Sequence, residues 1–300
     1  MGVSTTRLTD NIYLIDAPYH GRTGVLATYL VVSHRVALID PGPDPQAEGV
    51  LEALRSLGVE RLDYVCLTHV HLDHAGGTWL ILEEYPDARV HVHPRGLPHM
   101  ADPSKNLAVW ARAHGERAAL VGEVREVPQE ALLASADGES LELGGVSLEV
   151  LWTPGHSTHS HSYYERTSGL LFTGDAAGHT PVGGLLIPTS PIPYNPVDAA
   201  SSLARLQALE PRTLCISHFG AHEGASELLG ELKARVELWA RLADRAVEEG
   251  LEPRRLLELV AGEDPPIRAL LESHPEAETP LLQSLEGFTS YAHWVRRQAS

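Results

Sequence analysis

Apolar and polar residues alternate in short runs along the first half of the chain, a pattern that predicts β-strands. Between these runs apolar residues recur every three or four positions, as on one face of a helix, and Gly or Pro closes most segments. The predicted strands are Asn11–Asp16, Gly24–Val32, Arg35–Asp40, Arg61–Thr68 and Arg89–His93. The predicted helices are Pro45–Leu57, Ala75–Tyr85 and Leu107–Ala119.

A second set of elements follows in a similar order. Its predicted strands are Ser140–Leu143, Val146–Trp152, Ser162–Arg166, Gly169–Thr173 and Thr213–Ser217, and a helix over Val197–Leu209 precedes the last of them. Strands and helices that interleave twice predict two β-rich halves packed together, with helices outside them.

From about Ala221 onward the strand pattern stops and a helical pattern dominates. Apolar residues between Leu228 and Trp239 recur at spacings of three and four, which places them on one helix face. We therefore predict an α/β domain over residues 1–220 and a helical C-terminal extension over residues 221–300.

The composition is that of a folded globular chain, with 43% apolar and 21% charged residues among 300. The 23 basic residues against 40 acidic ones give a net charge of −17, which disfavours nucleic-acid or anionic-membrane binding. Cys66 and Cys215 both lie in apolar runs, so we expect free thiols in the reducing cytoplasm. The first residues lack a signal-peptide pattern, and no apolar run approaches the ~20 residues of a membrane span.

The stretch Thr68–Gly77 concentrates side chains that can bind metal ions. In an extended segment alternate side chains share a face, so His69 and His71 can reach one cation. Where the chain turns into the following helix, Asp73 and His74 can point to a neighbouring cation. Imidazole and carboxylate groups are ligands of Zn²⁺, Fe²⁺ and Mn²⁺, so this stretch predicts a metal site.

Three further candidate ligands each follow an apolar strand. His156 lies in the run TPGHS, Asp175 in FTGD and His218 in SHFG. Strand ends are rigid and therefore suit a site that needs tight geometry.

Together these residues resemble the motifs of the metallo-β-lactamase superfamily, in particular its glyoxalase II-like hydrolases. The resemblance covers about residues 10–220 and implies a four-layer αββα sandwich that holds two divalent metal ions. We expect Zn²⁺, with Fe or Mn as alternatives. The resemblance assigns His69, His71 and His156 to the first ion, Asp73, His74 and His218 to the second, and Asp175 to both. Asp40, in the run LIDPG, matches another recurrent position and is expected to orient the histidine loop.

The resemblance also implies a hydrolase, because two such ions can share a hydroxide that attacks a carbonyl carbon or a phosphorus near pH 7. Asp73 is then the catalytic residue that orients the hydroxide and passes a proton to the leaving group. We expect an ester, thioester or lactone-type small molecule as substrate, and leave a homodimer open. The alternatives are a phosphodiesterase and a mononuclear-iron persulfide dioxygenase, whose iron would be held by His69, His156 and Asp175.

The run after Asp175 leaves the substrate open. Glyoxalase II enzymes share the THxHxDHxGG pattern of Thr68–Gly77, but they carry a Gly-Cys-Gly-Arg-type run where this chain has Gly174–Gly178. True β-lactamases usually have Cys or Ser in place of Asp175, and acyl-homoserine lactonases have Tyr in place of Gly178.

Two segments offer candidate substrate contacts. The Tyr-His-Gly-Arg turn joins the first two predicted strands, and in the family this hairpin often overhangs the metals, which makes His20 and Arg22 candidates. The proline-rich loop over residues 176–196 could wall a pocket with its apolar side chains, and it supplies His179 and Tyr194.

Overall fold

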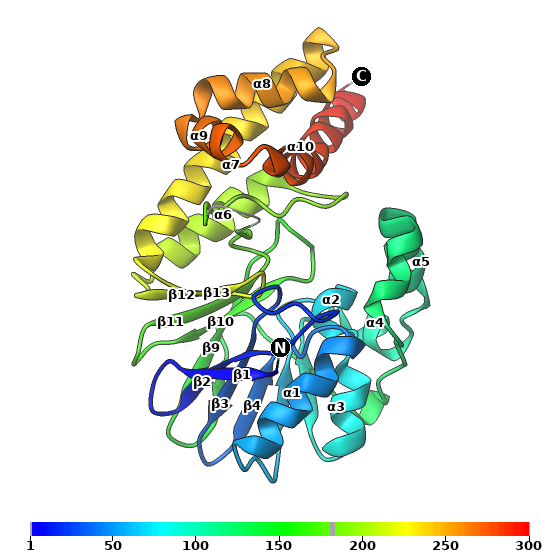
Figure 1. The fold of residues 1–300 in the computed structure, drawn as a ribbon, viewed down its shortest axis with the longest axis vertical. Helices are drawn as coiled ribbons and strands as arrows, with labels where there is room; N and C mark the ends of the chain where they lie inside the picture. Colours follow the sequence, from blue (N-terminus) through cyan, green and yellow to red (C-terminus); the bar gives the residue numbers. More distant parts are fainter. Residues whose placement is uncertain (1, 181–183, 300) are drawn as a thin grey trace. The chain divides into compact units, whose positions relative to one another are not determined.

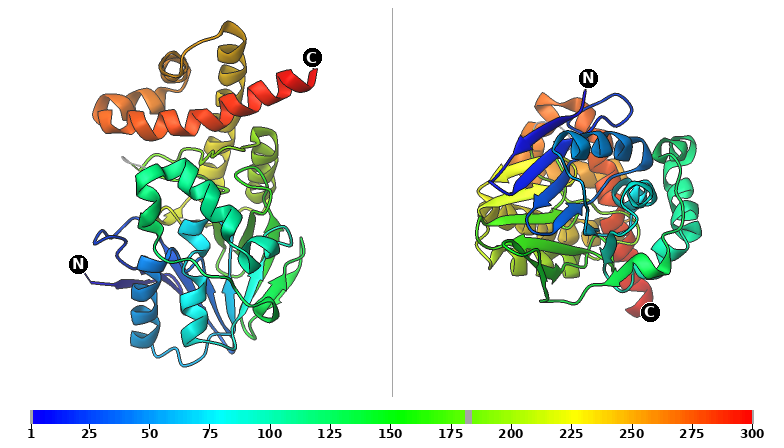
Figure 2. Two further views of the ribbon diagram at one scale, coloured as in Figure 1. Left: turned by 90° about the vertical axis from the view of Figure 1, so that its right-hand side faces the viewer. Right: turned by 90° about the horizontal axis from the view of Figure 1, so that it is seen from below.

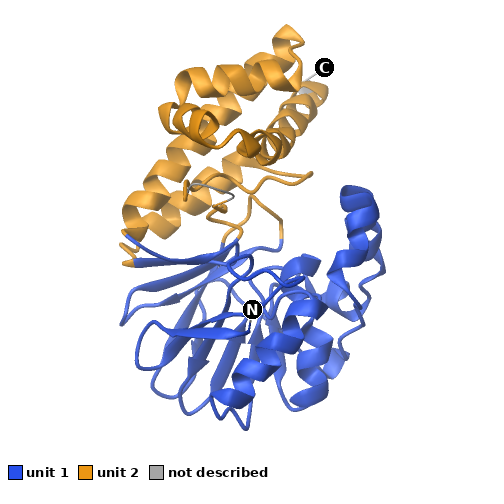
Figure 3. Ribbon diagram, viewed as in Figure 1, with its two compact units in different colours: residues 1–152, 159–174, 213–223 blue, residues 153–158, 175–212, 224–300 orange. Residues whose placement is uncertain are grey.

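The computed structural model describes residues 2–180 and 184–299, and their internal contacts divide the chain into two compact units (Figure 3). Unit 1 consists of residues 1–152, 159–174 and 213–223, and unit 2 of residues 153–158, 175–212 and 224–300. The two units alternate along the chain, and the domain boundary near residue 220 stays a prediction. Residues 181–183 of the predicted loop lie outside the described residues.

Over the described residues the named strands form two sheets, and both belong to unit 1 (Figure 1). The first sheet contains, in chain order, β1 (Ser4–Arg7), β2 (Ile12–Asp16), β3 (Thr28–Val32), β4 (Val36–Ile39), β5 (Tyr64–Cys66), β6 (Arg89–Val92) and β7 (Leu132–Ala134). The second contains β8 (Ser140–Glu142), β9 (Ser147–Trp152), β10 (His161–Glu165), β11 (Leu170–Gly174), β12 (Thr213–Ile216) and β13 (Gly220–Glu223), again in chain order. Pairing is parallel from β4 to β7 and between β11 and β12, and antiparallel elsewhere.

The alternation of side chains along each strand explains how the layers of unit 1 pack. Successive residues of a strand point to opposite faces of the sheet. In β3, Tyr29 and Val31 belong to an apolar core shared with Phe172 of the second sheet, whereas Leu30 faces the other way and packs in a core with Val50 of a helix. The first sheet of unit 1 therefore lies between a helical layer and the second sheet (Figure 2).

The helices of unit 1 are α1 (Asp44–Ser56), α2 (Leu72–Ala75), α3 (Thr78–Glu84), α4 (Leu97–Ala101), α5 (Ser104–His114) and the 3₁₀ segments η1 (Gly115–Val121) and η2 (Gln129–Ala131). Helix α1 starts directly after Pro43 with Asp44 in its first turn, where a negative charge is favourable. It stops before Gly58, whose φ of +72° is a conformation that glycine adopts readily.

Unit 2 contains α6 (Pro196–Gln207), α7 (Ala225–Glu249), α8 (Pro253–Glu263), α9 (Pro265–Ser273), the 3₁₀ segment η3 (Pro275–Ala277) and α10 (Glu278–Ala299). Trp239 of α7 and Phe288 of α10 are fully buried, with ring centroids 5.8 Å apart. Arg235 of α7 is also buried, and its Nε donates to Asp264 Oδ2 at 2.9 Å while its Nη1 donates to Leu186 O at 2.8 Å.

The predicted α/β sandwich with C-terminal helices is confirmed, with local differences. The predicted helix Ala75–Tyr85 is two helices, α2 and α3, and residues 221–223 belong to strand β13 although a helical pattern was expected there. Strands β1, β7 and β13 and helix α4 are additions to the predicted set. Among the described residues, every helix is too short or too polar to cross a membrane.

Candidate metal centre

The histidine loop, which we define as residues 67–74, leaves the end of β5 and enters α2. His71 has an extended backbone with φ −66° and ψ 149° and is the N-cap of α2, so Asp73 and His74 lie in the first helical turn. Gly77 follows α2, and a Cβ at this position would lie 2.5 Å from Ala47 Cβ of α1. A larger residue would push the loop and α2 away from α1, so glycine is needed there.

The first half of the loop brings two ring nitrogens together. His69 Nε2 lies 3.1 Å from His71 Nδ1, and His69 Nδ1 lies 3.1 Å from Thr68 Oγ1. His69 is fully buried and His71 is partly exposed. As the alternation of side chains predicts, His69 and His71 present nitrogen atoms to the same point.

The second half of the loop forms a compact group with His218, which follows β12. One ligand atom each from Asp73, His74 and His218 lies within 4.8 Å of the other two. Asp73 Oδ2 is 3.3 Å from His218 Nε2 and 3.7 Å from His74 Nε2. All three residues belong to unit 1.

Asp40, which follows β4, forms hydrogen bonds with the histidine loop and with the residue before His218. Its side chain is 2% exposed; Oδ1 accepts from Thr68 N at 2.8 Å, and Oδ2 accepts from Thr68 Oγ1 at 2.7 Å and Ser217 Oγ at 2.9 Å. Oδ2 also lies 3.1 Å from His74 Nδ1. A carboxylate at Nδ1 keeps the imidazole proton there, which leaves Nε2 of His74 as an electron-pair donor facing Asp73. The structure therefore brings Asp40 into contact with the histidine loop, and its role in orienting that loop stays a prediction.

The two remaining candidate ligands belong to unit 2 and lie next to one another. His156 Nε2 is 3.6 Å from Asp175 Oδ2, and His156 Nδ1 donates to Thr189 O at 2.9 Å. Asp175 directly follows Gly174, the last residue of β11. As with His74, the hydrogen bond that Nδ1 donates keeps the proton on that atom. Nε2 of His156 therefore has a free electron pair for a metal ion.

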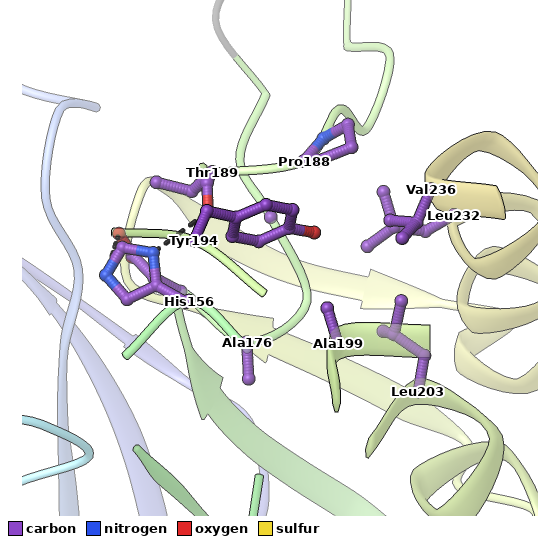
Figure 4. A pocket seen from close by; sticks show the side chains of 11 residues that line it. His156, Ala176, Pro188, Thr189, Tyr194, Ala199, Leu203, Leu232 and Val236 are labelled. Atoms are coloured by element: carbon purple, nitrogen blue, oxygen red, sulfur yellow. Dashed lines mark hydrogen bonds and ion pairs between the residues drawn. The ribbon is translucent and has the colours of Figure 1, made fainter. Parts of the chain in front are cut away.

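A small cavity in unit 2 adjoins His156 and Asp175 (Figure 4). Its volume of about 10 Å³ holds about one water molecule. The other lining residues are Ala176, Gly178, Pro188, Thr189, Tyr194, Ala199, Leu203, Leu232 and Val236. The cavity is too small for an acyl group, so it does not form a substrate pocket in this conformation.

The donor atoms have the chemistry and spacing that divalent metal ions require. Ligand atoms about 2.1 Å from a tetrahedral ion lie about 3.4 Å apart. The pairs described above are separated by 3.1, 3.3, 3.6 and 3.7 Å. Side chains of this type, held by buried hydrogen bonds at their other atoms, fit a metal ion of the zinc, iron or manganese class.

The candidate substrate residues of unit 1 lie in the predicted turn. His20 has a φ of +48°, and its Nε2 lies 2.7 Å from Leu120 O, which also accepts from Tyr19 Oη at 3.0 Å. Arg22 is exposed and closes the turn by pairing with Tyr19. These bonds attach the turn to η1, and a role of His20 or Arg22 in substrate binding stays a prediction.

The candidates of unit 2 lie in the loop after Asp175. His179 Nδ1 is 2.9 Å from Thr189 Oγ1, so His179 supports the residue that binds His156. Tyr194 is buried against Phe288, and burial raises the pKa of its hydroxyl. In Figure 4 its ring lies near His156 while its hydroxyl points toward the side chains of α7. A contact of His179 or Tyr194 with substrate stays a prediction.

Tyr19 of the predicted turn and His114 of α5 also lie near the site, and the sequence pattern did not indicate His114. The negative charge of Asp73 contributes, after burial, to the raised pKa of Tyr19, and it opposes the lowering by burial of the pKa of His114 in α5. Both side chains therefore lie close to Asp73. A lone histidine near the end of a predicted helix carries no signal for such a contact.

Comparison with known proteins finds a matching family model and related sequences. A family model described as the metallo-beta-lactamase superfamily matches residues 20–218. A metallo-beta-lactamase fold-containing protein of Sulfurisphaera tokodaii is 31% identical over 166 residues, which span 54% of this chain and 62% of that protein. A hydroxyacylglutathione hydrolase of Aeromonas hydrophila is 34% identical over 187 residues, which span 62% of this chain and 56% of that enzyme. The chain thus covers less than two thirds of the length of either relative.

Solved structures show the same fold. A metallo-beta-lactamase family protein from Thermus thermophilus matches with a TM-score of 0.68 and 24% identity, over 98% of this chain and 95% of that one. The crystal structure of the Sulfolobus tokodaii superfamily protein matches with a TM-score of 0.67 and 24% identity, over 76% of this chain and 87% of that one.

Proposed function

Because the chain belongs to the metallo-beta-lactamase superfamily, we propose that it is a metal-dependent hydrolase acting on an ester, thioester or lactone-type small molecule. The observation that carries the proposal is the group Asp73, His74 and His218, with Asp40 bound behind it. The name of one relative, hydroxyacylglutathione hydrolase, supports an acyl compound as substrate.

We propose that two divalent ions, zinc in the first instance, are bound by seven side chains. These are His69, His71 and His156 for one ion, Asp73, His74 and His218 for the other, and Asp175 for both. The donor separations within each unit support this assignment, as does the position of Asp175 immediately after β11, whose neighbour β12 leads to His218.

The chain's own residues would position the reactants and move a proton. When bound, the ions would lower the pKa of a coordinated water and stabilise negative charge on the substrate oxygen. Asp73 would orient the attacking water and then deliver its proton to the leaving group. Asp40 would keep the proton of His74 on Nδ1, and Thr189 O would do the same for His156.

Metal analysis is the first test. We expect about two equivalents of zinc, iron or manganese per chain purified without added metal, together with hydrolysis of members of a panel of esters, thioesters and lactones. His71→Ala and Asp175→Ala should each abolish turnover, whereas His293→Ala, at an exposed position of α10, should not. One iron per chain with oxygen uptake on a persulfide would favour the dioxygenase instead, and an active Asp175→Ala protein would contradict the bridging role.

The remaining expectations stay proposals of the same kind. We propose that the enzyme acts in the cytoplasm on a small molecule, without a nucleic-acid or membrane partner. The net charge of −17 supports this, because it repels phosphate backbones and anionic lipid. A homodimer is testable by sedimentation or light scattering.

A further inference from the structure

One side of the histidine loop is lined by α4 and the first turn of α5, which are attached to it by two close contacts. Asn106 Nδ2 donates to Val70 O at 2.8 Å, and Val70 stands between His69 and His71. A Cβ on Gly96, the N-cap of α4, would lie 2.9 Å from Val70 Cγ1, so the backbone of α4 begins directly against the loop. The side chains of α4 and α5 are therefore fixed next to the candidate metal ligands.

Nitrogen-bearing side chains extend from the loop toward these helices. The ring centroid of His159 lies 5.7 Å from that of His71 and 6.0 Å from that of His99, which belongs to α4. Lys105 is the second residue of α5, which begins three residues after the last residue of α4. Its positive charge adds to the effect of burial in lowering the pKa of His99. His99 and His159 are partly exposed and Lys105 is exposed, so solutes can reach all three.

This arrangement concentrates positive charge in an acidic protein. Residues 95–121 contain four basic and two acidic residues, whereas the whole chain has a net charge of −17. Of the two acidic residues, Asp102 is engaged at the start of α5, where its Oδ1 accepts from Ser104 N at 3.0 Å. The segment thus carries a net charge of +2 in a chain of net charge −17, so an anionic group is repelled less here than over most of the surface.

We propose that His99, Lys105 and His159 form a binding site for an anionic group of the substrate, a carboxylate or a phosphate. The imidazole N–H groups and the ammonium group would donate charge-assisted hydrogen bonds to its oxygen atoms. This inference rests on the proposed function, since it places the anion several bonds away from the ester or thioester carbonyl that is cleaved beside His71. It narrows the substrate class to acyl compounds with a negatively charged group at one end.

A matched set of substrates tests the site. An aryl ester of glutaric acid carries a free carboxylate, an analogue carries a terminal phosphate, and the methyl-capped ester is neutral. The chain's two lysines supply the control: Lys105→Glu and Lys233→Glu change the net charge equally, but Lys233 lies on α7 beside Glu237. We expect the ratio of kcat/KM for an anionic ester to that for the neutral ester to fall about tenfold or more in Lys105→Glu, and to change less than about twofold in Lys233→Glu.

Direct binding separates this inference from the proposed function. If wild-type protein cleaves none of the esters, the hydrolase proposal loses its support, while titration calorimetry with glutarate and with inorganic phosphate still tests the site. We expect the affinity for one of these anions to weaken about tenfold in Lys105→Glu, and the ring signals of His99 and His159 to shift in NMR spectra of the wild type. The preferred anion identifies the group. Equal effects of the two lysine substitutions, or no binding to the wild type, would overturn the site.

Discussion

Replacement of Asp40 by Asn tests how the chain prepares His74 for a metal ion. Asn tolerates the φ of +49° at this position and has the size of Asp. Thr68 N can only donate, so the amide oxygen must replace Oδ1, and the NH₂ group must replace Oδ2. At the place of Oδ2 the NH₂ group faces the hydroxyls of Thr68 and Ser217, which can rotate to accept a hydrogen bond. It also faces His74 Nδ1, which can accept a hydrogen bond only after losing its proton.

The consequence is a change of tautomer. In Asp40→Asn the proton of His74 moves to Nε2, the atom that faces Asp73 Oδ2 at 3.7 Å. A protonated Nε2 has no electron pair for a metal ion, so binding must first reverse the tautomer or break the hydrogen bond that the introduced amide donates to Nδ1. Loss of such a supporting partner costs about 10- to 100-fold in metal affinity, which corresponds to about 1.4–2.8 kcal/mol.

Zinc affinity measured by competition with a chromophoric chelator is the assay. Circular dichroism and thermal unfolding of the metal-free proteins show whether the fold persists. Ser217→Ala is the control, because it removes one hydrogen bond to Asp40 but keeps the carboxylate at His74. It should lower stability by about 1 kcal/mol and leave zinc affinity nearly unchanged. Wild-type zinc affinity in Asp40→Asn would refute the tautomer argument.

Two further predictions concern stability. Burial, aided by the charge of His91, lowers the pKa of His161 well below its ordinary value. Below about pH 6.5 the imidazole of His161 is therefore protonated in the unfolded chain but stays neutral in the folded chain. The free energy of unfolding should fall with decreasing pH by up to about 1.4 kcal/mol per pH unit. Urea unfolding of metal-free protein between pH 5 and 7 measures this slope, which should flatten in His161→Gln; an unchanged slope would exclude this residue as its source. Arg235→Ala leaves Asp264 buried without its partner and should cost about 3–5 kcal/mol. Lys233→Ala, at a more exposed ion pair, should cost less than about 1 kcal/mol in the same urea assay, and equal losses would contradict the argument.

Features that depend on neighbours along the chain could be predicted from the sequence. The alternation of His69 and His71 translates directly into two ring nitrogens 3.1 Å apart. The turn into a helix after His71 was also predictable, and it places Asp73 and His74 in the first turn of α2. Adjacent helical residues point in different directions, so their approach to one another did not follow from the helix alone. His218 was expected to join them only through the family resemblance, since it lies 144 residues further along the chain than His74.

Features that depend on distant neighbours could not be predicted in this way. β1 is polar and fully exposed, and β13 contains Gly220, so neither has the apolar alternation of a strand. Pairing with β2 and β12 makes them strands. The contact between Asn106 and Val70 likewise joins two segments that have no pattern in common.

The order of strands in the two sheets also bears on how the chain is made. Every strand of the first sheet pairs with its neighbour along the chain, and this sheet is complete at Ala134, before the second begins at Ser140. During translation the first sheet can assemble while the later strands are still inside the ribosome or not yet synthesised. Until they emerge, Tyr29, Val31 and Ile39 have no apolar cover, so we expect the nascent chain to need a chaperone over this interval.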